Sequence, residues 1–584
     1  MRRYFKNIHE FIESLEECGE LKRISEEVSP EIEISRITDA ESKKPRGGKA
    51  LLFENVKGSK FKVATNLFGS DFRMAMALGV KTLANAGDEI EKLTKISPPK
   101  SFADILETAK KILPLAKILP SKYRGKVAPC QEVVKKFDEV DLSEIPVLKC
   151  WPKDAGRFVT LPLVFTKSLD GKVGNLGMYR LQVFDKNTTG MHWHIHKDGA
   201  HFYGEYKKAG ARMPVAVAIG ASPATIFAAT APLPRNVDEL LLAGFFQKGS
   251  VKMVKCKTID MEVPAEADFV LEGYVEPDEL RLEGPFGDHT GYYSLADMYP
   301  VFHVTAITRR EKPIYCATLV GPPPMEDCYM AKATERIFLP LLKTIFPEIR
   351  DYFLPWEGVF HNIAIVSIKK EYPAHADRLI SGLWGQGQMS FCKAIVAVDE
   401  DVDPSDLKRV WEIFAERFDF STDLILSKGV LDVLDHASNS ALFGSKIGID
   451  LTSKLGDEPR RTPQKFAEDC DVKDIAKAAG VDEDCVEVFD KFCAIKIDKG
   501  ELSGRDILKE FSSSEAFKFF KVVAIFDENV DIKNVSKMLW KCFNNVDPAS
   551  DVIFSANAIF VDACKKNAAD GRTRPWPDEL VFDE

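Results

Sequence analysis

The pattern of apolar and polar positions predicts an α/β unit at the start of the chain. "KALLFENV" and "FKVATNLF" are short apolar runs typical of strands, and the segments from there to about residue 120 have mainly helical spacing. Before them, an amphipathic helix that ends at Gly19 is predicted by apolar residues at helical spacing, which are Ile8, Phe11, Ile12 and Leu15. We therefore expect the N-terminal part to combine helices with a sheet.

The middle third of the chain, roughly Val127 to Gly321, is predicted to be rich in β-structure. "LPLVFTKSLDGKVGNLGMYRLQVFD" predicts paired strands around an Asp-Gly turn, and strand-like runs continue through "VAVAIG", "MEVPAEADFVLEGYVE" and "PVFHVTAITRR". From about Pro324 the pattern returns to alternating helices and strands.

One internal repeat is visible. "KAIVAVDEDVDPSDLKRVWEIF" starts at Lys393 and "KVVAIFDENVDIKNVSKMLWKCF" starts at Lys521, and each predicts a buried strand, an acidic turn and an amphipathic helix. Such a βα unit cannot bury its apolar face alone, so the last hundred or so residues are expected to pack beside the preceding domain or on a partner subunit. Alternatively, two βα units of similar composition resemble each other by chance, and two copies do not make a solenoid. The matched acids are Asp399, Glu400, Asp403, Asp419 and Asp423 in the first copy and Asp527, Glu528, Asp531, Asp547 and Asp551 in the second.

Composition narrows the class of protein. The 584 residues are enough for several domains, and a content of 45% hydrophobic and 29% charged residues is typical of a globular protein. The net charge is −10 and there is no long Lys/Arg run, so we expect no nucleic-acid partner and at most peripheral membrane association. The longest uncharged run, between Arg212 and Arg235, is interrupted by prolines and predicts a buried strand, turn and helix. Scattered cysteines without zinc spacing, and an N-terminus unlike an export signal, favour the cytoplasm.

The histidines are concentrated in one place. Four of the ten lie in "GMHWHIHKDGAHF", and they are His192, His194, His196 and His201. On a strand, alternate residues share a face, so the first three would point the same way. That face could carry metal ligands, or it could be a polar strand face on which neighbouring groups satisfy each imidazole.

Two further segments carry charged groups suited to chemistry. In "GNLGMYRLQVFD", Asn175 offers an oxygen ligand and Arg180 offers, on a strand, a planar cation suited to a carboxylate or a phosphate; a structural ion pair at a sheet edge is the alternative. In "LEGPFGDHTGYY", Glu283 and Asp288 flank a Gly-Pro-Phe-Gly bend. Acids held close together repel, so we expect one pKa to rise, as a general acid requires, unless the segment is a solvated acidic turn.

Two signals are weaker. Glu239 in "RNVDELLLAG" is predicted to lie in the first turn of a helix, where acids are common because the helix N-terminus favours them. Lys446 in "FGSKIGIDLTSK" is predicted to lie in a glycine-flanked loop, where it could hold a phosphate or be exposed.

Taken together and in this order, these segments resemble the UbiD family of prenylated-flavin-dependent decarboxylases. The resemblance covers roughly residues 1 to 460 and also includes "VAVAIGASPATI", "PVFHVTAITRR" and "FPEIRDYFLPWEG". It implies an α+β multidomain fold and a homo-oligomer, either a dimer or a hexamer. The implied domains are 1–120, an N-terminal α/β domain; 121–325, a split β-barrel that binds prenylated FMN; 326–465, a C-terminal α/β oligomerisation domain; and 466–584, a C-terminal extension with a partial βα repeat of 393–424.

The resemblance also implies cofactors and site residues. Prenylated FMN would be supplied by a separate flavin prenyltransferase, and Mn²⁺ (or Mg²⁺), with K⁺ as a further possibility, would tie its phosphate to the protein. The implied metal ligands are Asn175, His196 and Glu239. The implied flavin contacts are Met178, Tyr179, Arg180, His192, Trp193, His194, Lys197, Asp198 and Lys446. The implied catalytic network is Arg180, Glu283 and Asp288, with Asp288 as the proton donor.

The implied activity is the reversible, non-oxidative decarboxylation of an aromatic carboxylic acid. An aspartate at position 288 favours a hydroxybenzoate- or naphthoate-type substrate, which would fit a role in quinone biosynthesis. Three alternatives remain open: carboxylation of a phenolic compound in catabolism, flavin oxidoreduction with plain FMN, and a non-catalytic assembly subunit. The intact set of Arg180, Glu283 and Asp288 argues against the last of these, and the lack of a G-x-G-x-x-G element argues weakly against the second.

Overall fold

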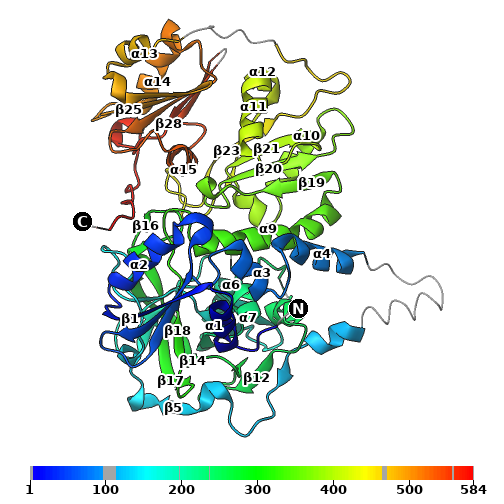
Figure 1. Ribbon diagram of the computed structural model, residues 1–584, viewed down its shortest axis with the longest axis vertical. Helices are drawn as coiled ribbons and strands as arrows, with labels where there is room; N and C mark the ends of the chain where they lie inside the picture. Colours follow the sequence, from blue (N-terminus) through cyan, green and yellow to red (C-terminus); the bar gives the residue numbers. More distant parts are fainter. Residues whose placement is uncertain are drawn as a thin grey trace, which may run out of the picture. The chain divides into compact units, whose positions relative to one another are not determined.

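The structure, a computed structural model, describes residues 4–95, 113–195, 197–235, 237–462, 470–555 and 558–582. The chain forms two compact units, of which the first comprises Met1–Ile337 with Asp578–Glu584 and the second Phe338–Pro577 (Figure 1). No helix of the described residues is long and apolar enough to cross a membrane.

The predicted N-terminal helix is present. Helix α1 (Ile8–Glu17) buries Ile8, Phe11, Ile12 and Leu15, and the side chain of Asn7 caps its first turn. The helices of the first unit are α1, α2 (Glu33–Ser42), α3 (Asp71–Ala77), α4 (Leu83–Thr94), α6 (Asp198–Ala209), α7 (Pro223–Ala228), α8 (Glu239–Phe246) and the start of α9 (Glu326–Ile345). Short 3-10 helices are η1 (Pro45–Gly47), η2 (Leu113–Ile118), η3 (Pro129–Gln131), η4 (Phe137–Glu139) and η5 (Leu142–Glu144).

The N-terminal sheet recruits one strand from far along the chain. Its order is β1-β2-β3-β18, with β1 (Leu21–Val28), β2 (Ala50–Val56), β3 (Lys62–Thr65) and β18 (Ile314–Cys316). Strand β18 pairs parallel with β3, and Ile314 lies opposite Lys62. Sequence patterns identified β2 and β3 but not this partner, because pairing between distant segments leaves no local signal.

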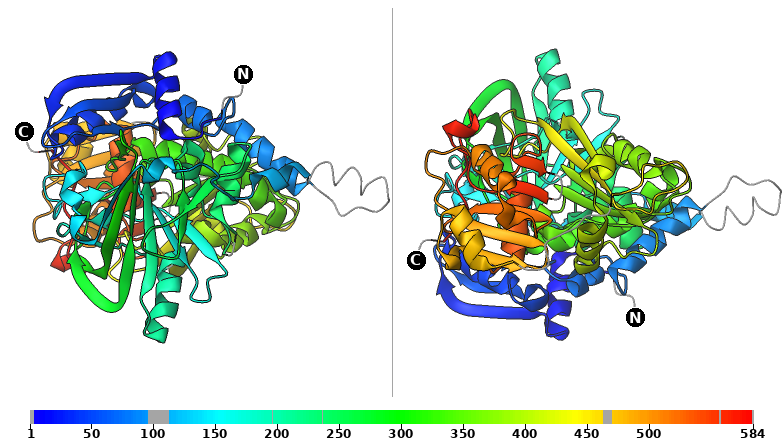
Figure 2. Two further views of the ribbon diagram at one scale, coloured as in Figure 1. Left: turned by 90° about the horizontal axis from the view of Figure 1, so that it is seen from below. Right: turned by 90° about the horizontal axis from the view of Figure 1, so that it is seen from above.

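The predicted β-rich middle third forms the central sheet, whose two longest strands, β14 and β17, are drawn in green (Figures 1 and 2). The sheet order is β10-β17-β14-β11-β7-β8, and β5 also pairs with β17. Within the described residues no pairing joins β10 to β8, so this sheet is not a closed barrel. Its strands are β5 (Val133–Lys136), β7 (Leu163–Lys167), β8 (Gly174–Gly177), β10 (Thr188–Gly190), β11 (Met213–Ile219), β14 (Phe269–Glu283) and β17 (Asp297–Arg309).

Smaller strand groups complete the first unit. One is the sheet β13-β12-β4, and the others are the pairs β15-β16 and β6-β9. Their bounds are β4 (Ser121–Lys122), β12 (Lys252–Lys255), β13 (Glu262–Pro264), β15 (Phe286–Gly287), β16 (Tyr293–Ser294), β6 (Phe158–Val159) and β9 (Leu181–Gln182). As predicted, the uncharged run after Arg212 forms a buried strand and helix, β11 and α7.

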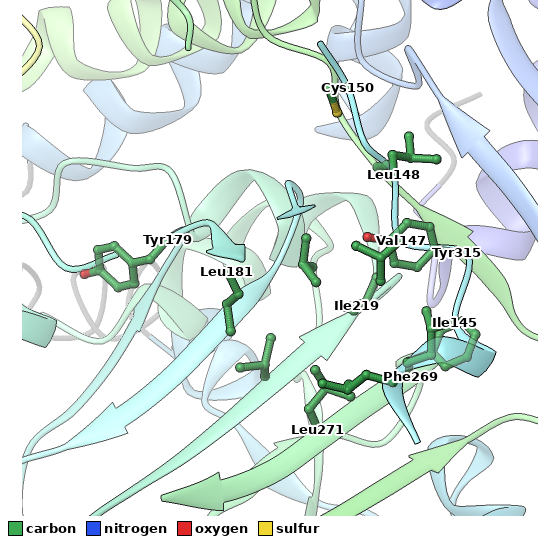
Figure 3. Close-up of a cluster of buried hydrophobic side chains, with 14 of the residues drawn as sticks. Ile145, Val147, Leu148, Cys150, Tyr179, Leu181, Ile219, Phe269, Leu271 and Tyr315 are labelled. Atoms are coloured by element: carbon green, nitrogen blue, oxygen red, sulfur yellow. The ribbon is translucent and has the colours of Figure 1, made fainter. Parts of the chain in front are cut away.

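The core of the first unit holds the functional segments in place. Figure 3 shows part of one buried apolar cluster, with Ile219, Phe269 and Tyr315 among the labelled side chains. The rings of Phe269 and Tyr315 lie 6.4 Å apart and meet edge to face. Full burial of side chains of this size contributes about 1.5–3 kcal/mol each, so the strand ends that carry polar groups extend from a rigid base.

The second unit contains two five-stranded sheets of the same order, β19-β20-β21-β23-β22 and β24-β25-β26-β28-β27, in the green-to-yellow and orange-to-red parts of the chain (Figures 1 and 2). The first sheet has β19 (Ile349–Phe353), β20 (Ile363–Ile368), β21 (Ala394–Asp399), β22 (Leu424–Val430) and β23 (Phe443–Asp450). The second has β24 (Val486–Phe489), β25 (Phe492–Ile497), β26 (Val522–Asp527), β27 (Val552–Ser555) and β28 (Ala558–Asp562). The helices are α10 (His375–Leu383), α11 (Leu407–Arg417), α12 (Phe420–Asp423), α13 (Val472–Ala479), α14 (Gly504–Ser513) and α15 (Val535–Asn545).

Candidate active site

Arg180, Glu283 and Asp288 meet in one buried cluster although they come from three segments. Glu283 is the last residue of β14, and Asp288 follows β15. The sequence pattern predicted that Arg180 lies on a strand, but it lies in the link between β8 and β9. Arg180 Nε donates to Glu283 Oε1 at 2.9 Å, and Arg180 Nη1 donates to Asp288 Oδ2. A third donor, Nη2, reaches Ser294 Oγ at 2.9 Å. One guanidinium therefore links both acids, and its planar fork suits this geometry.

The bend between the two acids is fixed by backbone contacts. Asp154 Oδ1 accepts the backbone N–H of Gly287 at 2.7 Å, and its other oxygen accepts the backbone N–H of Trp151 at 2.9 Å. A Cβ on Gly287 would lie 2.2 Å from the indole of Trp151, so the position requires glycine. Sequence patterns did not identify Asp154, because it lies far along the chain from the bend that it supports.

The histidine cluster does not form the predicted strand. Strand β10 ends at Gly190, and His192 and His194 follow it in irregular backbone. Their Nε2 atoms nevertheless lie 2.8 Å apart, and His192 Nδ1 lies 2.6 Å from Glu283 Oε2. The His192 ring also stacks on Tyr299, with ring centres 4.1 Å apart. His196 lies outside the described residues.

These contacts fix the tautomer of His192. Burial, together with the positive charge of Arg180, lowers the pKa of His192, which therefore stays neutral near pH 7. An ionised Glu283 can only accept a hydrogen bond, so His192 must donate from Nδ1 and accept at Nε2. His194 then donates to His192.

The expectation that one of the two acids has a raised pKa is wrong for this structure. Burial alone would raise the pKa of Glu283, but the hydrogen bond from His192 and the charge of Arg180 outweigh it and hold that pKa at about 2. Burial likewise opposes ionisation of Asp288, but its hydrogen bond with His289 and the charge of Arg180 hold its pKa well below the usual range. The sequence showed two neighbouring acids but not the cation between them, and the cation reverses the sign of the shift.

His289 is a contact of Asp288 that the sequence pattern did not single out. Its backbone N–H and its ring Nδ1 lie 2.8 Å and 2.9 Å from Asp288 Oδ1. Arginine does not release a proton at ordinary pH. Among the described residues, His289 is therefore the side chain that both hydrogen-bonds to Asp288 and can exchange a proton with it.

Two of the three predicted metal ligands lie close together. Asn175 is in β8 and Glu239 is the first residue of α8, and Glu239 Oε2 accepts the backbone N–H of Leu176, the neighbour of Asn175, at 2.9 Å. Burial raises the pKa of Glu239 to about 7, and no ion pair with Glu239 occurs within the described part of the chain. A buried carboxylate without a counter-charge favours a bound cation, and carboxylate and amide oxygens suit Mn²⁺ or Mg²⁺. This pair fits the predicted ion, although the described residues contain no group of three or more His, Cys, Asp or Glu that could hold a metal.

The predicted flavin contacts of the first unit come from the link after β8 and from the segment that runs from β10 into α6. Tyr179 is buried and hydrogen-bonds with Asn175, and burial raises its pKa to about 12. The indole Nε1 of Trp193 is buried with no hydrogen-bond partner among the described residues. Such an orphaned donor suits a polar ligand group. The remaining contacts are Met178, which is half-buried, and Lys197 and Asp198 at the start of α6, where Asp198 pairs with Arg235.

Lys446 belongs to the second unit and lies on β23 rather than in the predicted loop. Its amino group donates to the backbone oxygens of Ser390 and Cys392 at 2.5 Å and 2.9 Å, and burial lowers its pKa to about 8. The prediction failed because glycines on both sides were taken as loop residues, whereas here Gly444 and Gly448 are strand positions with no room for a Cβ.

Comparison with known proteins identifies the family. Three domain descriptions of 3-octaprenyl-4-hydroxybenzoate carboxy-lyase, named UbiD, match the chain: the N-terminal domain over residues 12–93, the Rift-related domain over 121–323 and the C-terminal domain over 328–451 and 483–566. The match to the C-terminal domain extends to residue 566, beyond the residues, roughly 1 to 460, over which the sequence segments resemble the family.

Individual proteins and solved structures are also similar to the chain. An uncharacterized protein of Archaeoglobus fulgidus is 49% identical over 473 residues, which is 80% of this chain and 96% of the relative. The closed form of vanillic acid decarboxylase from Sedimentibacter hydroxybenzoicus is 26% identical, covers 81% of this chain and 98% of its own, and has a TM-score of 0.71. An evolved dimeric form of the UbiD-class enzyme HmfF from Pelotomaculum thermopropionicum, in complex with prFMN, is 27% identical, covers 79% and 97%, and has a TM-score of 0.65. The chain therefore belongs to the UbiD family and is a carboxy-lyase.

Proposed function

We propose that this enzyme removes the carboxyl group of an aromatic acid as carbon dioxide, with prenylated FMN as its cofactor. The observation that carries the proposal is the buried cluster in which Arg180 holds Glu283 and Asp288. In this cluster a cation that can bind a carboxylate lies beside two acids that can donate or accept a proton. The relatives add support, since one is a vanillic acid decarboxylase and another binds prFMN.

Loss of carbon dioxide from a carboxylate consumes one proton per turnover, and Asp288 is the proposed donor. In the cluster as it stands Asp288 is ionised because Arg180 and His289 stabilise its charge. A substrate carboxylate that takes over the Nη1 donor of Arg180 would remove part of that stabilisation, and burial would then raise the pKa of Asp288. Substrate binding would thus create the acid that the reaction needs.

His289 is the proposed route by which the proton returns to Asp288. Its Nδ1 proton can move to Asp288 Oδ1, at 2.9 Å, while Nε2 takes a proton from solvent, so that the ring ends neutral and the solvent proton neutralises the Asp288 carboxylate. The side chain of His289 is 21% exposed, whereas that of His192 on Glu283 is 6% exposed. His192 is therefore the proposed positioning residue for Glu283, and His289 the proposed proton carrier for Asp288.

The cofactor site is proposed on the residues predicted from the sequence. Asn175, His196 and Glu239 would hold Mn²⁺ (or Mg²⁺), with K⁺ as a further ion, against the flavin phosphate. Met178, Tyr179, Trp193, Lys197 and Asp198 would surround the flavin, and Lys446 is a further flavin contact that the family resemblance implies. When bound, prenylated FMN would supply an electron sink for the charge left by departing carbon dioxide. A flavin prenyltransferase would supply this cofactor. The enzyme itself would be a cytoplasmic homo-oligomer.

The substrate class is proposed to be a hydroxybenzoate- or naphthoate-type acid of quinone biosynthesis. The description of the matching family as an octaprenyl-hydroxybenzoate carboxy-lyase supports this class. Carboxylation of a phenolic compound is the same reaction run in reverse, and the direction would follow from the relative concentrations of carbon dioxide and product.

The test is to purify the chain after co-expression with a flavin prenyltransferase and to screen aromatic acids for carbon dioxide release. We expect a flavin whose mass exceeds that of FMN and turnover of at least one hydroxybenzoate or naphthoate. Protein expressed without the prenyltransferase is the control and should be inactive. Plain FMN with hydride transfer, in place of carbon dioxide release, would replace the proposal with a flavin oxidoreductase.

A further inference from the structure

The two sheets of the second unit agree in more than strand order. In both, the outermost strand at one end pairs antiparallel, the next three strands are parallel, and the other outermost strand is antiparallel again. The acidic turns also coincide: the backbone N–H of Asp419 donates to Asp423 Oδ2 at 2.9 Å, and that of Asp547 donates to Asp551 Oδ2 at 2.8 Å.

Buried ion pairs recur at equivalent positions. Lys454 pairs with Asp450 at 3.0 Å, four residues before it, and Lys566 pairs with Asp562 at 3.3 Å, also four residues before it. Each aspartate also receives a lysine that follows the second strand of its sheet, Lys370 or Lys499, both at 3.3 Å. Chance similarity between two βα units would not reproduce a set of buried charges, because each charge must find its partner.

The contacts between the two sheets are reciprocal. Lys393, at the start of β21, donates from Nζ to the backbone oxygen of Val546 at 3.0 Å. Lys521, at the start of β26, donates from Nζ to the backbone oxygen of Phe418. Each carbonyl directly precedes the acidic turn of the opposite copy. When residue i of one copy contacts residue j of the other and the reverse contact also exists, the interface has twofold character, as in a symmetric dimer.

The apolar core between the copies is shared. One buried cluster contains Ile365 and Val396 of the first sheet together with Ala524 and Phe526 of the second. The opposite faces of the two sheets have separate cores, one with α10 and Val366, the other with α14 and Ile525. Each copy therefore has one face of its own and one face that only the other copy completes.

We propose that the second copy, residues 486–566, acts as an in-chain partner subunit for the first copy, residues 349–454. The surface that two identical subunits would use for pairing is occupied inside one chain by a duplicated segment. Any homo-oligomer of this enzyme must then assemble through other surfaces, and the two copies must open and close as one cooperative unit.

The test is hydrogen exchange measured by mass spectrometry on the full-length protein, with two neighbouring substitutions in β20. Ile365→Ala lies in the shared core and Val366→Ala in the core of the first copy alone. We expect Ile365→Ala to raise exchange in β25, β26 and β28 by about tenfold or more, as well as in its own sheet. Val366→Ala should raise exchange mainly in the first sheet.

Lys521→Met tests the reciprocal contact from the other side. It should raise exchange around Phe418 in the first copy, while Lys533→Met, at an exposed position of the same copy, should leave exchange unchanged. If Ile365→Ala does not fold, Ile365→Val gives a smaller change of the same pattern. Exchange confined to the copy that carries the substitution, in all variants, would overturn the proposal.

Discussion

Replacing Arg180 with methionine removes the cation that stabilises two buried acids. The side chain of Arg180 is 8% exposed and that of Glu283 is 1% exposed, so water cannot take its place. A pKa of about 2 for Glu283, instead of the ordinary 4.5, corresponds to about 3 kcal/mol of stabilisation of the folded, ionised form. Because this pKa is depressed, the contribution is present above about pH 4.5 and is lost as the pH falls towards 2.

In Arg180→Met the sign of the pH dependence should reverse. Burial is then opposed mainly by the hydrogen bond of His192 with Glu283 and those of His289 with Asp288, so the pKa values of both acids rise and their ionisation destabilises the fold. We expect a loss of about 3–5 kcal/mol in the free energy of unfolding at pH 8 and a smaller loss at pH 5. Urea unfolding at the two pH values, followed by circular dichroism and tryptophan fluorescence, measures both.

Arg281→Met is the matched control. Arg281 lies on β14, two residues before Glu283, and pairs with Asp185 at 3.4 Å, but these side chains are 43% and 48% exposed. An exposed pair of this kind contributes less than about 1 kcal/mol, with little dependence on pH. Arg180 does not stabilise the two buried acids if Arg180→Met loses no more stability than Arg281→Met, or if Arg180→Met is more stable at pH 8 than at pH 5.

Three further predictions concern single side chains. Asp288→Asn should abolish carbon dioxide release while the flavin absorbance of the purified protein persists, and full activity would reject Asp288 as the donor. His289→Asn keeps an N–H near Asp288 but cannot carry a proton, so kcat should fall about 10²-fold and should partly recover when a small buffer molecule is added. The control is His303→Asn, which alters a histidine paired with Glu279 and should not change kcat. Glu239→Gln keeps the acceptor for Leu176, yet MnCl₂ with FMN should raise the melting temperature of the wild type and not of this variant.

The sequence predicted the N-terminal helix, the β-rich middle and the buried strand and helix after Arg212, because each depends on local periodicity. It did not predict the partner of β3, since β18 lies some 250 residues further along the chain. The histidine segment alternates like a strand, yet within the described residues the ladder between β10 and β17 ends at Gly190. Alternating residues are compatible with a strand, but a strand also requires backbone hydrogen bonds to a neighbouring strand.

The same limit applies to the site. Residue types identified Arg180, Glu283 and Asp288 as candidates, and the structure places them together, but their proposed roles remain predictions. The sequence could not show that Arg180 lies between the acids, that Asp154 holds the bend, or that Tyr299 stacks on His192. These contacts join segments that are far apart in the chain, so they depend on the complete fold.

The most direct measurement is the position of deuterium in the product formed in D₂O. If Asp288 donates the proton, wild-type enzyme loaded with prenylated FMN places one deuterium on the ring carbon that carried the carboxylate, as seen by NMR, and Asp288→Asn forms no such product. Product deuterated at that carbon by Asp288→Asn at the wild-type rate would show that Asp288 is not the proton donor.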